Sequence, residues 1–460
     1  MRIKADDTIA AVATPLGVGG VGIVRLSGPE SLAMAGAMFR PSGSRGLAEA
    51  PTHTLLHGWI EKDQNPLDEV LAVAMRAPRS YTREDVVEIH CHGGLLAVRT
   101  VLKLALEQGA RLADPGEFTM RAFLNGRLDL TRAEAVGDLV KARSLAALRI
   151  SANQLRGRLY EEISLLKERV ARATALLEAG LDFPEEDVVF HHGRQMQDDL
   201  EGVRGRLGDL LERARQGRLV REGLPVAIVG RPNVGKSSLL NALLRESRAI
   251  VTGVPGTTRD TLEETAEIRG LPLRLIDTAG IRDTADEVEL EGISRTRRAI
   301  AQAELVLLVC DGSAPLEPED ESLLRQARPD ACLVVVNKAD LLKGPEPAWV
   351  DRLGDLPWTA ISALTGAGMD TMEDWIRDWA LFDERPVLED AVITNIRQQE
   401  AAQKALESVN SALQGLAEGR GEELIAIDLH GTLAALGEIV GETTADDLLD
   451  RIFAEFCIGK

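Results

Sequence analysis

The stretch GRPNVGKS, residues 230–237, decides the fold of the region around it. It matches the phosphate-binding pattern G-x-x-x-x-G-K-S, whose glycines let backbone N–H groups converge on phosphate oxygens at the N-terminus of a helix. An apolar run at residues 225–229 predicts a buried strand before it, and residues 238–244 predict a helix after it. Strand, loop and helix are the setting that this motif requires. We therefore predict a nucleoside triphosphate site in which Lys236 reaches the β- and γ-phosphates and Ser237 ligates magnesium.

A second motif, DTAG at residues 277–280, follows an apolar run that we interpret as a strand. Asp277 is expected to hold the magnesium shell, and the Gly280 N–H to sense the γ-phosphate. Between the two motifs lies TGVPGTTRD, residues 252–260. Thr258 in this loop is expected to close over the γ-phosphate and to complete the magnesium shell. The alternative is a flexible loop of glycine, proline and threonine.

Two further motifs predict that the nucleotide is GTP. NKAD, residues 337–340, closes an apolar run, and the Asp340 carboxylate can accept hydrogen bonds from N1–H and the 2-amino group of guanine. Adenine lacks both donors, and a site built for such hydrogen bonds rejects an analogue without them. SAL, residues 362–364, follows another apolar run, and its Ala363 N–H is expected to meet guanine O6. The residues expected to contact GTP are Asn233, Val234, Gly235, Lys236, Ser237, Ser238, Thr252, Gly253, Val254, Pro255, Gly256, Thr257, Thr258, Asp277, Thr278, Ala279, Gly280, Asn337, Lys338, Ala339, Asp340, Ser362, Ala363 and Leu364.

The sequence indicates the catalytic residues less directly than the nucleotide-binding residues. The residue after DTAG is Ile281, at the position where Ras-like proteins carry the glutamine that orients the attacking water. An isoleucine cannot orient water, so hydrolysis needs another device. One candidate is Asn233, whose side-chain oxygen could bind a monovalent cation beside the phosphates. The other is an acid from DEVELE, residues 286–291, although such a run also fits a solvated surface.

Segments along the whole chain resemble the bacterial family of tRNA-modification GTPases known as MnmE or TrmE. The motifs GRPNVGKS, GTTRD and DEVE agree with that family, and so do segments towards both ends of the chain. These segments are Ala-Thr-Pro at 13–15, GGVGIVR at 19–25, PGEF at 115–118, RAFLN at 121–125, LLDRIF at 448–453 and CIGK at 457–460. The resemblance covers essentially all 460 residues.

The resemblance implies a potassium-activated GTPase whose G domains pair across a dimer. Glu289 would orient the attacking water through an intervening water, which makes it an expected catalytic residue together with Lys236. The potassium ligands that the resemblance implies are Asn233 through its side chain, Thr252 and Val254 through backbone carbonyls, and the nearby Thr257.

The resemblance also implies an N-terminal domain similar to tetrahydrofolate-binding enzymes, with 5-formyltetrahydrofolate bound near a dimer interface. The matching positions are Arg25, Glu84, Arg127 and Lys460. Glu84 could accept hydrogen bonds from the amino edge of the pterin, while Arg25 and Arg127 suit carboxylates or carbonyls. The family pattern has lysine where this chain has Arg127, so the charge is kept but its geometry differs. Apart from the resemblance, these are ordinary exposed charges.

The implied function joins GTP hydrolysis to RNA modification. With an FAD- and NADH-dependent partner protein of the MnmG or GidA type, in a hetero-oligomer, the protein would act on carbon 5 of the tRNA wobble uridine. It would add an aminomethyl or carboxymethylaminomethyl group from a folate one-carbon unit, with hydrolysis driving conformational change. Two alternatives share the G motifs: a ribosome-assembly GTPase, which usually carries a basic RNA-binding module, and a scaffold switched by nucleotide. Slow turnover that ignores potassium would favour the scaffold.

The apolar pattern changes along the chain and predicts a multidomain fold. Residues 1–125 mix strand-like and helix-like runs, an α+β pattern that the resemblance assigns to folate binding and dimerisation. Residues 126–219 and 379–460 have helical spacing, and residues 220–378 form an α/β P-loop G domain. The resemblance implies that the two helical stretches form one α-helical bundle domain with the G domain inserted, which periodicity alone cannot show.

Composition fits a soluble protein of a reducing cytoplasm. No apolar run approaches the roughly 18 residues of a membrane span, the N-terminus lacks a signal-peptide core, and the four cysteines have no framework spacing. The formal charge of −20 is unfavourable for an RNA enzyme. The best tRNA-facing surface is residues 141–172, with eight basic and three acidic side chains on a predicted long helix, although such charges also fit a solvated face.

Three other features carry weaker signals. GVGGVG at residues 17–22 matches G-x-G-x-x-G, but we expect no strand before it, and a strand-like run follows it rather than a helix. We therefore reject dinucleotide binding and expect a tight loop. His90 and His92 share one face of a predicted strand while Cys91 points to the other, which argues against a metal site. Cys457 fits a nucleophile and a packed tail cysteine equally well.

Overall fold

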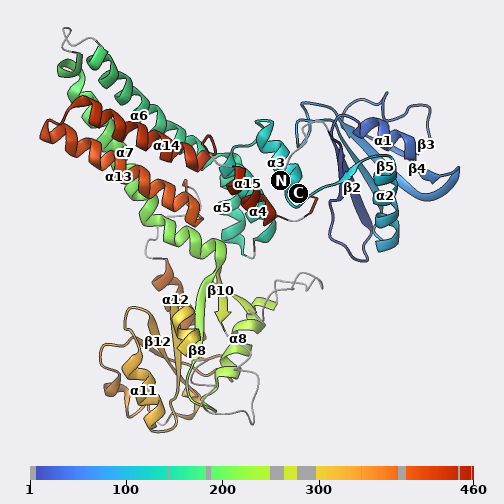
Figure 1. Cartoon of the computed structure of the whole chain (residues 1–460). Coiled ribbons are helices and arrows are strands. Elements are labelled where there is room, and N and C mark those ends of the chain that lie inside the picture. The colour runs from blue at the N-terminus through green and yellow to red at the C-terminus, as the bar shows by residue number, and fades with distance from the viewer. Residues whose placement is uncertain are drawn as a thin grey trace. The chain divides into compact units, whose positions relative to one another are not determined.

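The computed structural model describes residues 7–142, 144–182, 188–248, 264–276, 297–342, 344–381, 390–443, 446–456 and 458–459. One compact unit comprises Met1–Lys141, Ser151–Gly208 and Glu400–Lys460, and the other comprises Ala142–Ile150 and Asp209–Gln399 (Figure 1). The second unit is thus inserted, in sequence, into the first. This confirms the predicted fold class, an α+β N-terminal domain, a helical domain and an inserted P-loop G domain. The domain boundaries given above stay predictions.

The N-terminal part of the first unit is a seven-stranded sheet in the order β3-β4-β5-β6-β2-β1-β7. Neighbouring strands are antiparallel, except that β1 and β7 are parallel. The elements are β1 Ile9–Val12, β2 Val21–Ser27, α1 Ser31–Met38, β3 Phe39–Pro41, β4 Thr54–Lys62, β5 Asn65–Met75, β6 Val86–His92, α2 Leu95–Glu107 and β7 Arg111–Leu112.

Alternation along these strands decides which side chains lie under α1 and α2, because successive strand residues point to opposite faces. Leu26, Ala72 and Ile89 point inward and are fully buried in the core beneath the two helices. Their neighbours point to the second face, where many side chains are exposed. We call this second surface the open face; it includes Arg25, Leu55, His57, Trp59, Leu71, Glu88 and His90.

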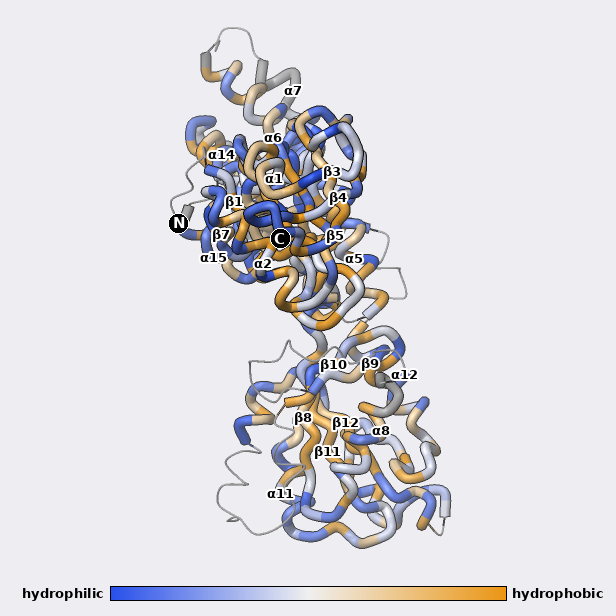
Figure 2. The backbone as a smooth tube through the Cα atoms, turned by 90° about the vertical axis from the view of Figure 1, so that its right-hand side faces the viewer, coloured by the Kyte–Doolittle hydropathy of each residue, from blue (hydrophilic) through white to orange (hydrophobic). Residues whose placement is uncertain are grey.

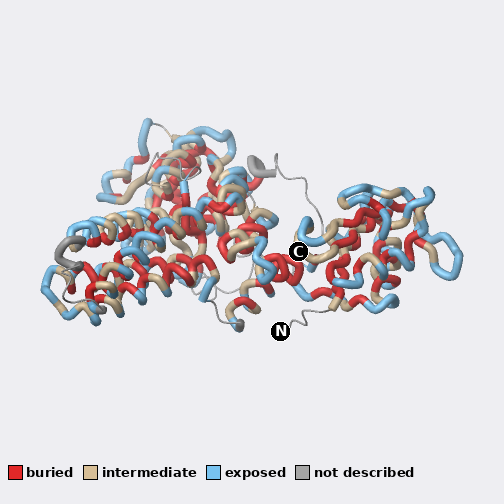
Figure 3. The backbone as a smooth tube through the Cα atoms, turned by 90° about the horizontal axis from the view of Figure 1, so that it is seen from above, coloured by how far each residue is buried: buried red, intermediate tan, exposed pale blue. Residues whose placement is uncertain are grey.

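The remainder of the first unit is helical, and buried and exposed stretches alternate along its helices (Figure 3). Helix α6 packs against α14 in antiparallel fashion, since His430 Nε2 lies 2.9 Å from Glu178 Oε1 and Lys167 pairs with Glu442. The helices are α3 Glu117–Leu124, α4 Leu130–Lys141, α6 Arg158–Asp182, α14 Glu422–Val440 and α15 Asp446–Ala454, while α5 Leu145–Arg156, α7 Val188–Glu222 and α13 Ile396–Glu418 contribute residues to both units.

The predicted long helix over residues 141–172 is wrong: Lys141 ends α4, α5 begins at Leu145, and a second break at Gly157 separates α5 from α6. Gly157 has φ +99°, a conformation that favours glycine. A Cβ there would lie 1.9 Å from Arg132 Nη2, so the guanidinium occupies the space that a side chain needs. The apolar stripe itself is confirmed from Leu159 onward; Leu159, Ile163, Leu166, Val170 and Leu177 are buried.

The inserted unit holds a six-stranded sheet in the order β13-β12-β11-β8-β10-β9, parallel except for β9. Its core strands are apolar on both faces, as a parallel sheet covered by helices requires, and Figure 2 shows β8 as mainly hydrophobic. The elements are β8 Leu224–Val229, α8 Lys236–Arg248, β9 Glu264–Ile268, β10 Leu271–Ile276, β11 Leu305–Asp311, α11 Pro318–Gln326, β12 Cys332–Asn337, β13 Trp358–Ala360 and α12 Met369–Ala380.

Strand β8 lies between β10 and β11, so the chain leaves its carboxyl end at the point where the strand order reverses. Ligands of open α/β sheets bind at such a switch point. The predicted strand at residues 225–229 and the predicted helix after the glycine-rich loop are therefore confirmed as β8 and α8. None of the described helices is long and apolar enough to cross a membrane.

Candidate functional sites

The glycine-rich loop between β8 and α8 has backbone conformations and close contacts that favour glycine. Gly230 and Gly235 have φ of +149° and +100°, and Asn233 adopts a left-handed conformation with φ +64°. A Cβ on Gly230 would lie 2.3 Å from the Val309 carbonyl oxygen, and one on Gly235 would lie 2.1 Å from Asn337 Nδ2. The loop thus passes close to β11 and to the NKAD motif, and its backbone N–H groups lie at the start of α8.

Lys236 folds back over this loop. Its Nζ donates to the carbonyl oxygens of Gly230 and Arg231, both at 2.8 Å. Burial lowers the pKa of the Lys236 ammonium because the charged form loses solvation. The ammonium is therefore held beside the loop by hydrogen bonds to two neutral carbonyl oxygens. A bound phosphate would offer charged oxygens, which form stronger hydrogen bonds with an ammonium.

Asn337 joins the phosphate-binding loop to the SAL motif. Its buried side chain donates from Nδ2 to the Val234 carbonyl oxygen at 2.9 Å and accepts at Oδ1 from the Ala363 N–H at 3.0 Å. The structure thus brings together three segments that lie up to 129 residues apart in sequence (363 − 234). Asp340 is exposed beside them on a short 3₁₀ helix, Ala339–Leu341, so its carboxylate is accessible to a base.

Two residues near this site were not predicted from the sequence. Asp311, at the end of β11, pairs with Lys338 Nζ at 2.6 Å. Burial would raise the pKa of the Asp311 carboxyl, but hydrogen bonds from Lys338 and Ser313 lower it below its usual value. The signal that could have found it is a lone acid closing an apolar strand, the same place in the β11 pattern that Asn337 takes in β12.

Arg231 anchors the loop to α11. Its Nη1 donates to Glu317 Oε1 at 2.7 Å, and its Nε lies 3.0 Å from Asp320 Oδ2. Asp320 is buried, and Glu317 and Asp320 form a capping box at the start of that helix. The sequence motif includes Arg231 but contains nothing that identifies these partners.

Part of the predicted nucleotide site lies outside the described residues. This applies to Thr252, Gly253, Val254, Pro255, Gly256, Thr257, Thr258, Asp277, Thr278, Ala279, Gly280, Ile281 and Glu289. Cys457 and Lys460 also lie outside the described residues, and so does Arg143 of the proposed tRNA-facing segment. The assignments of these residues stay predictions.

The structure brings Arg25, Glu84 and Arg127 to one end of the N-terminal sheet. Arg25 pairs across the strands with Glu88, its Nε and Nη2 both 2.7 Å from Glu88 Oε1. Its Nη1 donates to the Gly459 carbonyl oxygen at 3.3 Å. Gly459 has φ +93°, and a Cβ there would lie 2.2 Å from the Val12 carbonyl oxygen, so the tail fits closely against the end of β1.

Tyr81 stands between two of these arginines. The guanidinium carbons of Arg25 and Arg127 lie 5.6 and 4.7 Å from the centre of its ring. Arg127 Nη1 also donates to the Tyr81 carbonyl oxygen at 2.7 Å. An open hollow of about 380 Å³ adjoins them and is lined by His53, Met75, Arg79, Ser80, Tyr81 and Arg127.

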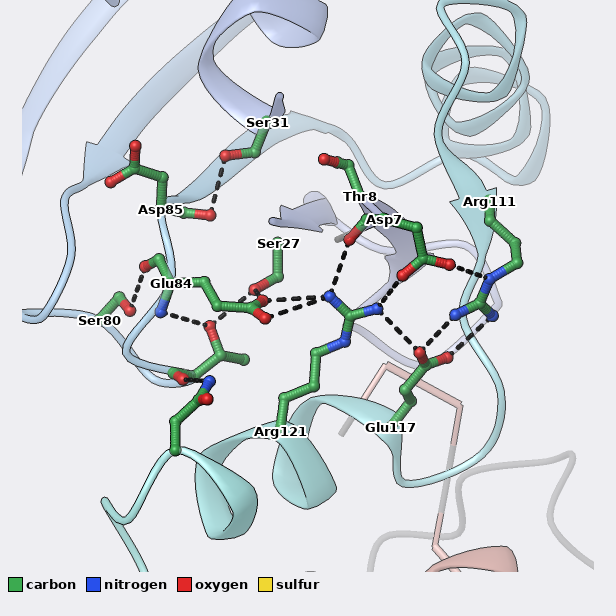
Figure 4. Close-up of polar contacts among 12 residues, drawn as sticks. Asp7, Thr8, Ser27, Ser31, Ser80, Glu84, Asp85, Arg111, Glu117 and Arg121 are labelled. Carbon is green, nitrogen blue, oxygen red and sulfur yellow. Dashed lines mark hydrogen bonds and ion pairs between the residues drawn. The ribbon is translucent and has the colours of Figure 1, made fainter. Parts of the chain in front are cut away.

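Glu84 is held from the interior (Figure 4). Ser27 Oγ donates to Glu84 Oε2 at 2.7 Å, and Arg121 Nη1 lies 3.2 and 3.3 Å from the two carboxylate oxygens. Arg121 also contacts Asp7 and Glu117, which both pair with Arg111. Glu117 and Arg121 belong to the motifs PGEF and RAFLN, but the sequence did not indicate a role for them.

The glycine-rich segment at residues 17–22 approaches another part of the backbone. The Gly19 N–H donates to the Gly93 carbonyl oxygen at 3.1 Å, and β2 follows the segment, as expected. The expectation that no strand precedes the segment is wrong, because β1 ends at Val12. On β6, His92 Nδ1 lies 2.6 Å from Asp68 Oδ1, and this hydrogen bond raises the pKa of the exposed imidazole. Cys91 is buried on the opposite face, beneath the helices.

The chain matches known proteins over almost its whole length. Residues 130–457 match the model of the MnmE helical domain, and residues 8–127 match that of the GTP-binding protein TrmE N-terminus. Relatives from Symbiobacterium thermophilum and Moorella thermoacetica are each 48% identical over 99% of this chain and 100% of their own. A relative from Geobacillus thermodenitrificans is 45% identical over 99% of both chains. Each is named "tRNA modification GTPase MnmE".

Proposed function

The chain belongs to the MnmE family of tRNA modification GTPases, and from this premise we propose how it combines GTP hydrolysis with chemistry on the wobble uridine. It is a GTP hydrolase acting in tRNA modification. The proposed reaction adds an aminomethyl or carboxymethylaminomethyl group at carbon 5 of that uridine. The one-carbon unit comes from 5-formyltetrahydrofolate, and a flavin- and NADH-dependent partner protein of the MnmG type takes part.

The loop between β8 and α8 is proposed to bind the phosphates of GTP. Lys236 exchanges its two carbonyl partners for β- and γ-phosphate oxygens, and Ser237, at the start of α8, ligates magnesium. Thr258 and Asp277 complete the magnesium shell. Bound magnesium neutralises charge on the phosphate oxygens.

A potassium ion fits the chemistry of Asn233. Asn233 is exposed on the loop and has a left-handed backbone conformation. An amide oxygen is a suitable hard donor for an alkali cation, and Thr252, Val254 and Thr257 would add oxygens. Positive charge at this place stabilises the transition state in the way an arginine finger does. Glu289 orients the attacking water.

Recognition of the guanine base is proposed for Asp340 and Ala363. Asp340 accepts from N1–H and the 2-amino group, and the Ala363 N–H meets O6. Asn337 supports this proposal because it joins the Ala363 backbone to the phosphate-binding loop, so base and phosphates bind one connected structure.

Folate binding is supported by one observation above all: Arg25 binds the Gly459 carbonyl oxygen, which brings the end of the chain to the region of Glu84 and Arg127. Lys460 follows Gly459 in the sequence but lies outside the described residues, and we propose that it supplies a further cation. Of these residues, Glu84 is the acceptor for the pterin edge, and Arg25, Arg127 and Lys460 suit carbonyl and carboxylate groups. Arg127 keeps the positive charge of the lysine expected at its position.

We propose a homodimer through the open face of the N-terminal sheet, a hetero-oligomer with the partner protein, and a cytoplasmic location. Leu55, Trp59 and Leu71 give the open face an apolar surface that a second copy could cover. The tRNA is expected to approach the segment at residues 141–172. Some of its charges are already paired there, Lys167 with Glu442 and Arg172 with Asp199, which reduces the charge available to phosphates.

The test is mass spectrometry of tRNA nucleosides from cells that lack this gene, complemented by the intact chain or by a chain without residues 457–460. We expect the modified wobble uridine to disappear and to return only with the intact chain. Unchanged nucleosides, in cells without a redundant enzyme, would contradict the wobble-uridine role. Restoration by the shortened chain would remove the tail from the folate site.

A further inference from the structure

Four charged side chains beneath the proposed folate site form a closed ring of alternating charge (Figure 4). Arg111 pairs with Asp7 at 2.7 Å and with Glu117 at 2.5 Å. Arg121 pairs with the same two acids, with Asp7 at 2.5 Å and with Glu117 at 3.1 Å. Each acid is thus bridged by both guanidiniums, and the ring of two acids and two bases is neutral.

Glu84 is the fifth charge and stands outside this ring. It contacts the ring only through Arg121 Nη1, and a further carboxylate outside the ring, Asp114, lies 3.8 Å from Arg111 Nη1. On the Arg121 side, Glu84 is therefore the carboxylate that the neutral ring does not balance. The Glu117 and Arg121 side chains are 0% and 2% exposed, Glu84 is 19% exposed, and Asp7 and Arg111 are 23% and 39% exposed. Glu84 is thus a partly exposed carboxylate whose partner in the ring, Arg121, is buried.

The orientation of that carboxylate is fixed by two donors on its inner side. Arg121 Nη1 contacts both oxygens, and the Ser27 hydroxyl donates to Oε2. Ser27 is fully buried, and its oxygen lies 2.7 Å from Thr82 Oγ1, which limits its rotation. A carboxylate has about four acceptor sites. The inner donors leave the outer ones for a ligand with adjacent N–H groups.

We propose that Arg121 and Ser27 are positioning residues for the folate ligand. They do not touch it; they hold the Glu84 carboxylate turned so that its oxygens meet the ring N–H and the 2-amino group of the pteridine. This inference rests on the folate function proposed above. Its physical basis is that preorganised acceptors lose less freedom when a ligand binds.

The ring also ties β7 and α3 to the start of β1, and a purely structural role is the rival explanation. The two explanations differ in their effect on ligand recognition. A structural role predicts a loss of stability with no preference among folate ligands. The positioning role predicts a loss that depends on the donors that Glu84 receives.

The test uses the full chain and the variants Ser27→Ala and Ser31→Ala. Ser31 is the matched control, because it is also fully buried and donates to the neighbouring Asp85 carbonyl oxygen at 2.8 Å, but not to Glu84. We expect Ser27→Ala to bind 5-formyltetrahydrofolate about 10-fold more weakly by calorimetry, the usual value of a hydrogen bond to a charged group. Ser31→Ala should bind as the wild type does.

A ligand change completes the test. With a folate analogue that lacks the 2-amino group, the Ser27→Ala penalty should fall to less than about 3-fold, because the donor that needs an oriented Glu84 is gone. Equal penalties for both ligands, or equal loss in both serine variants, would overturn the positioning role. Thermal unfolding of the full chain, measured in parallel, reports that each variant is folded. A wild-type chain that binds no folate would instead contradict the folate function itself.

Discussion

The buried side-chain amide of Asn337 makes two hydrogen bonds to different segments of the nucleotide site. It donates to the phosphate-binding loop at Val234 and accepts from Ala363 in the guanine-binding segment. A hydrophobic or charged residue could not supply both a donor and an acceptor at this place. The NKAD motif predicts a guanine site, but these two partners cannot be predicted, because they depend on contacts across 103 and 26 residues of chain.

Replacement of Asn337 by alanine should weaken GTP binding by on the order of 10-fold or more, since two buried hydrogen bonds of about 1 kcal/mol each are lost. Titration with a fluorescent guanine nucleotide measures this. Asn65→Ala is the matched control, because Asn65 is exposed at the start of β5. Unchanged affinity in the Asn337 variant would show that the link is not needed for the site.

Glu289→Ala should lower turnover by about 10²-fold or more while nucleotide affinity holds, the pattern for a group that acts only in the transition state. Glu291→Ala, in the same acidic run, is the control and should hydrolyse GTP normally. Single-turnover hydrolysis separates chemistry from product release. Near-normal turnover in the Glu289 variant would remove it from the catalytic role.

The Asp311–Lys338 pair should give the G domain a pH-dependent stability. The pKa of Asp311 in the folded protein lies below its ordinary value of 3.8, so the pair stabilises the fold above that pH and loses its effect as pH falls through the lower folded value. The difference in free energy of unfolding between wild type and Lys338→Met should therefore shrink below pH 3.8.

Urea unfolding followed by tryptophan fluorescence measures that difference. Four of the five tryptophans, Trp349, Trp358, Trp375 and Trp379, lie in the inserted unit, so the signal reports mainly on it. A difference that stays constant from pH 7 to about pH 2.5 would contradict the assignment.

Helix α11 has a role that its position along the chain does not suggest. Through Asp320 and Glu317 it fixes Arg231, and through Arg231 it fixes the first turn of the phosphate-binding loop. The inner of these two acids should matter more, because Asp320 is 1% exposed and the Glu317 side chain is 58% exposed. Exposed ion pairs contribute little to the free energy of folding.

Asp320→Asn should therefore raise the KM for GTP several-fold and lower the melting temperature, because Arg231 keeps its charge without a buried partner. Glu317→Gln, the control, should change both values only slightly. Steady-state hydrolysis and thermal unfolding give the two readouts. Equal effects of the two substitutions would mean that burial does not decide the strength of the anchor.

The elements that could be predicted from sequence are those whose signal is local. The strands of the G domain are continuous apolar runs, and β8 and α8 follow directly from the motif between them. The break at Gly157 was missed because the apolar spacing continues through it. Glycine is favoured there by the positive φ of the break and by the Arg132 guanidinium, from a different helix, and neither can be read from the apolar spacing.

On the scale of the whole molecule, the open face of the N-terminal sheet is the surface best suited to a second copy. Leu71→Glu places a charge at its centre, opposite His57 and His90 on the neighbouring strands, and should convert a dimer into monomers in light scattering. Leu96→Glu is the control, since Leu96 is 81% exposed on α2, outside that face. A dimer that survives Leu71→Glu would place the interface elsewhere.

The charge ring and the tail contact show why the N-terminal site could be predicted only in part. Arg25, Glu84 and Arg127 were found by resemblance, but their supports were not. Arg121 meets Asp7 across 114 residues, and Arg25 meets Gly459 across 434. Local sequence patterns do not predict contacts between residues so far apart. The residues that face the ligand could therefore be named, while the residues that orient them could not.

The antiparallel packing of α6 on α14 has a consequence for synthesis on the ribosome. Helix α6 ends at Asp182 and α14 begins at Glu422, so about 240 residues separate them, roughly 12–50 s at the usual 5–20 residues per second. During that time the apolar stripe of α6 has emerged without its partner, while the inserted unit between them can already fold. A nascent chain stalled before residue 422 should therefore bind chaperones that recognise exposed apolar helices, and release them once α14 has emerged.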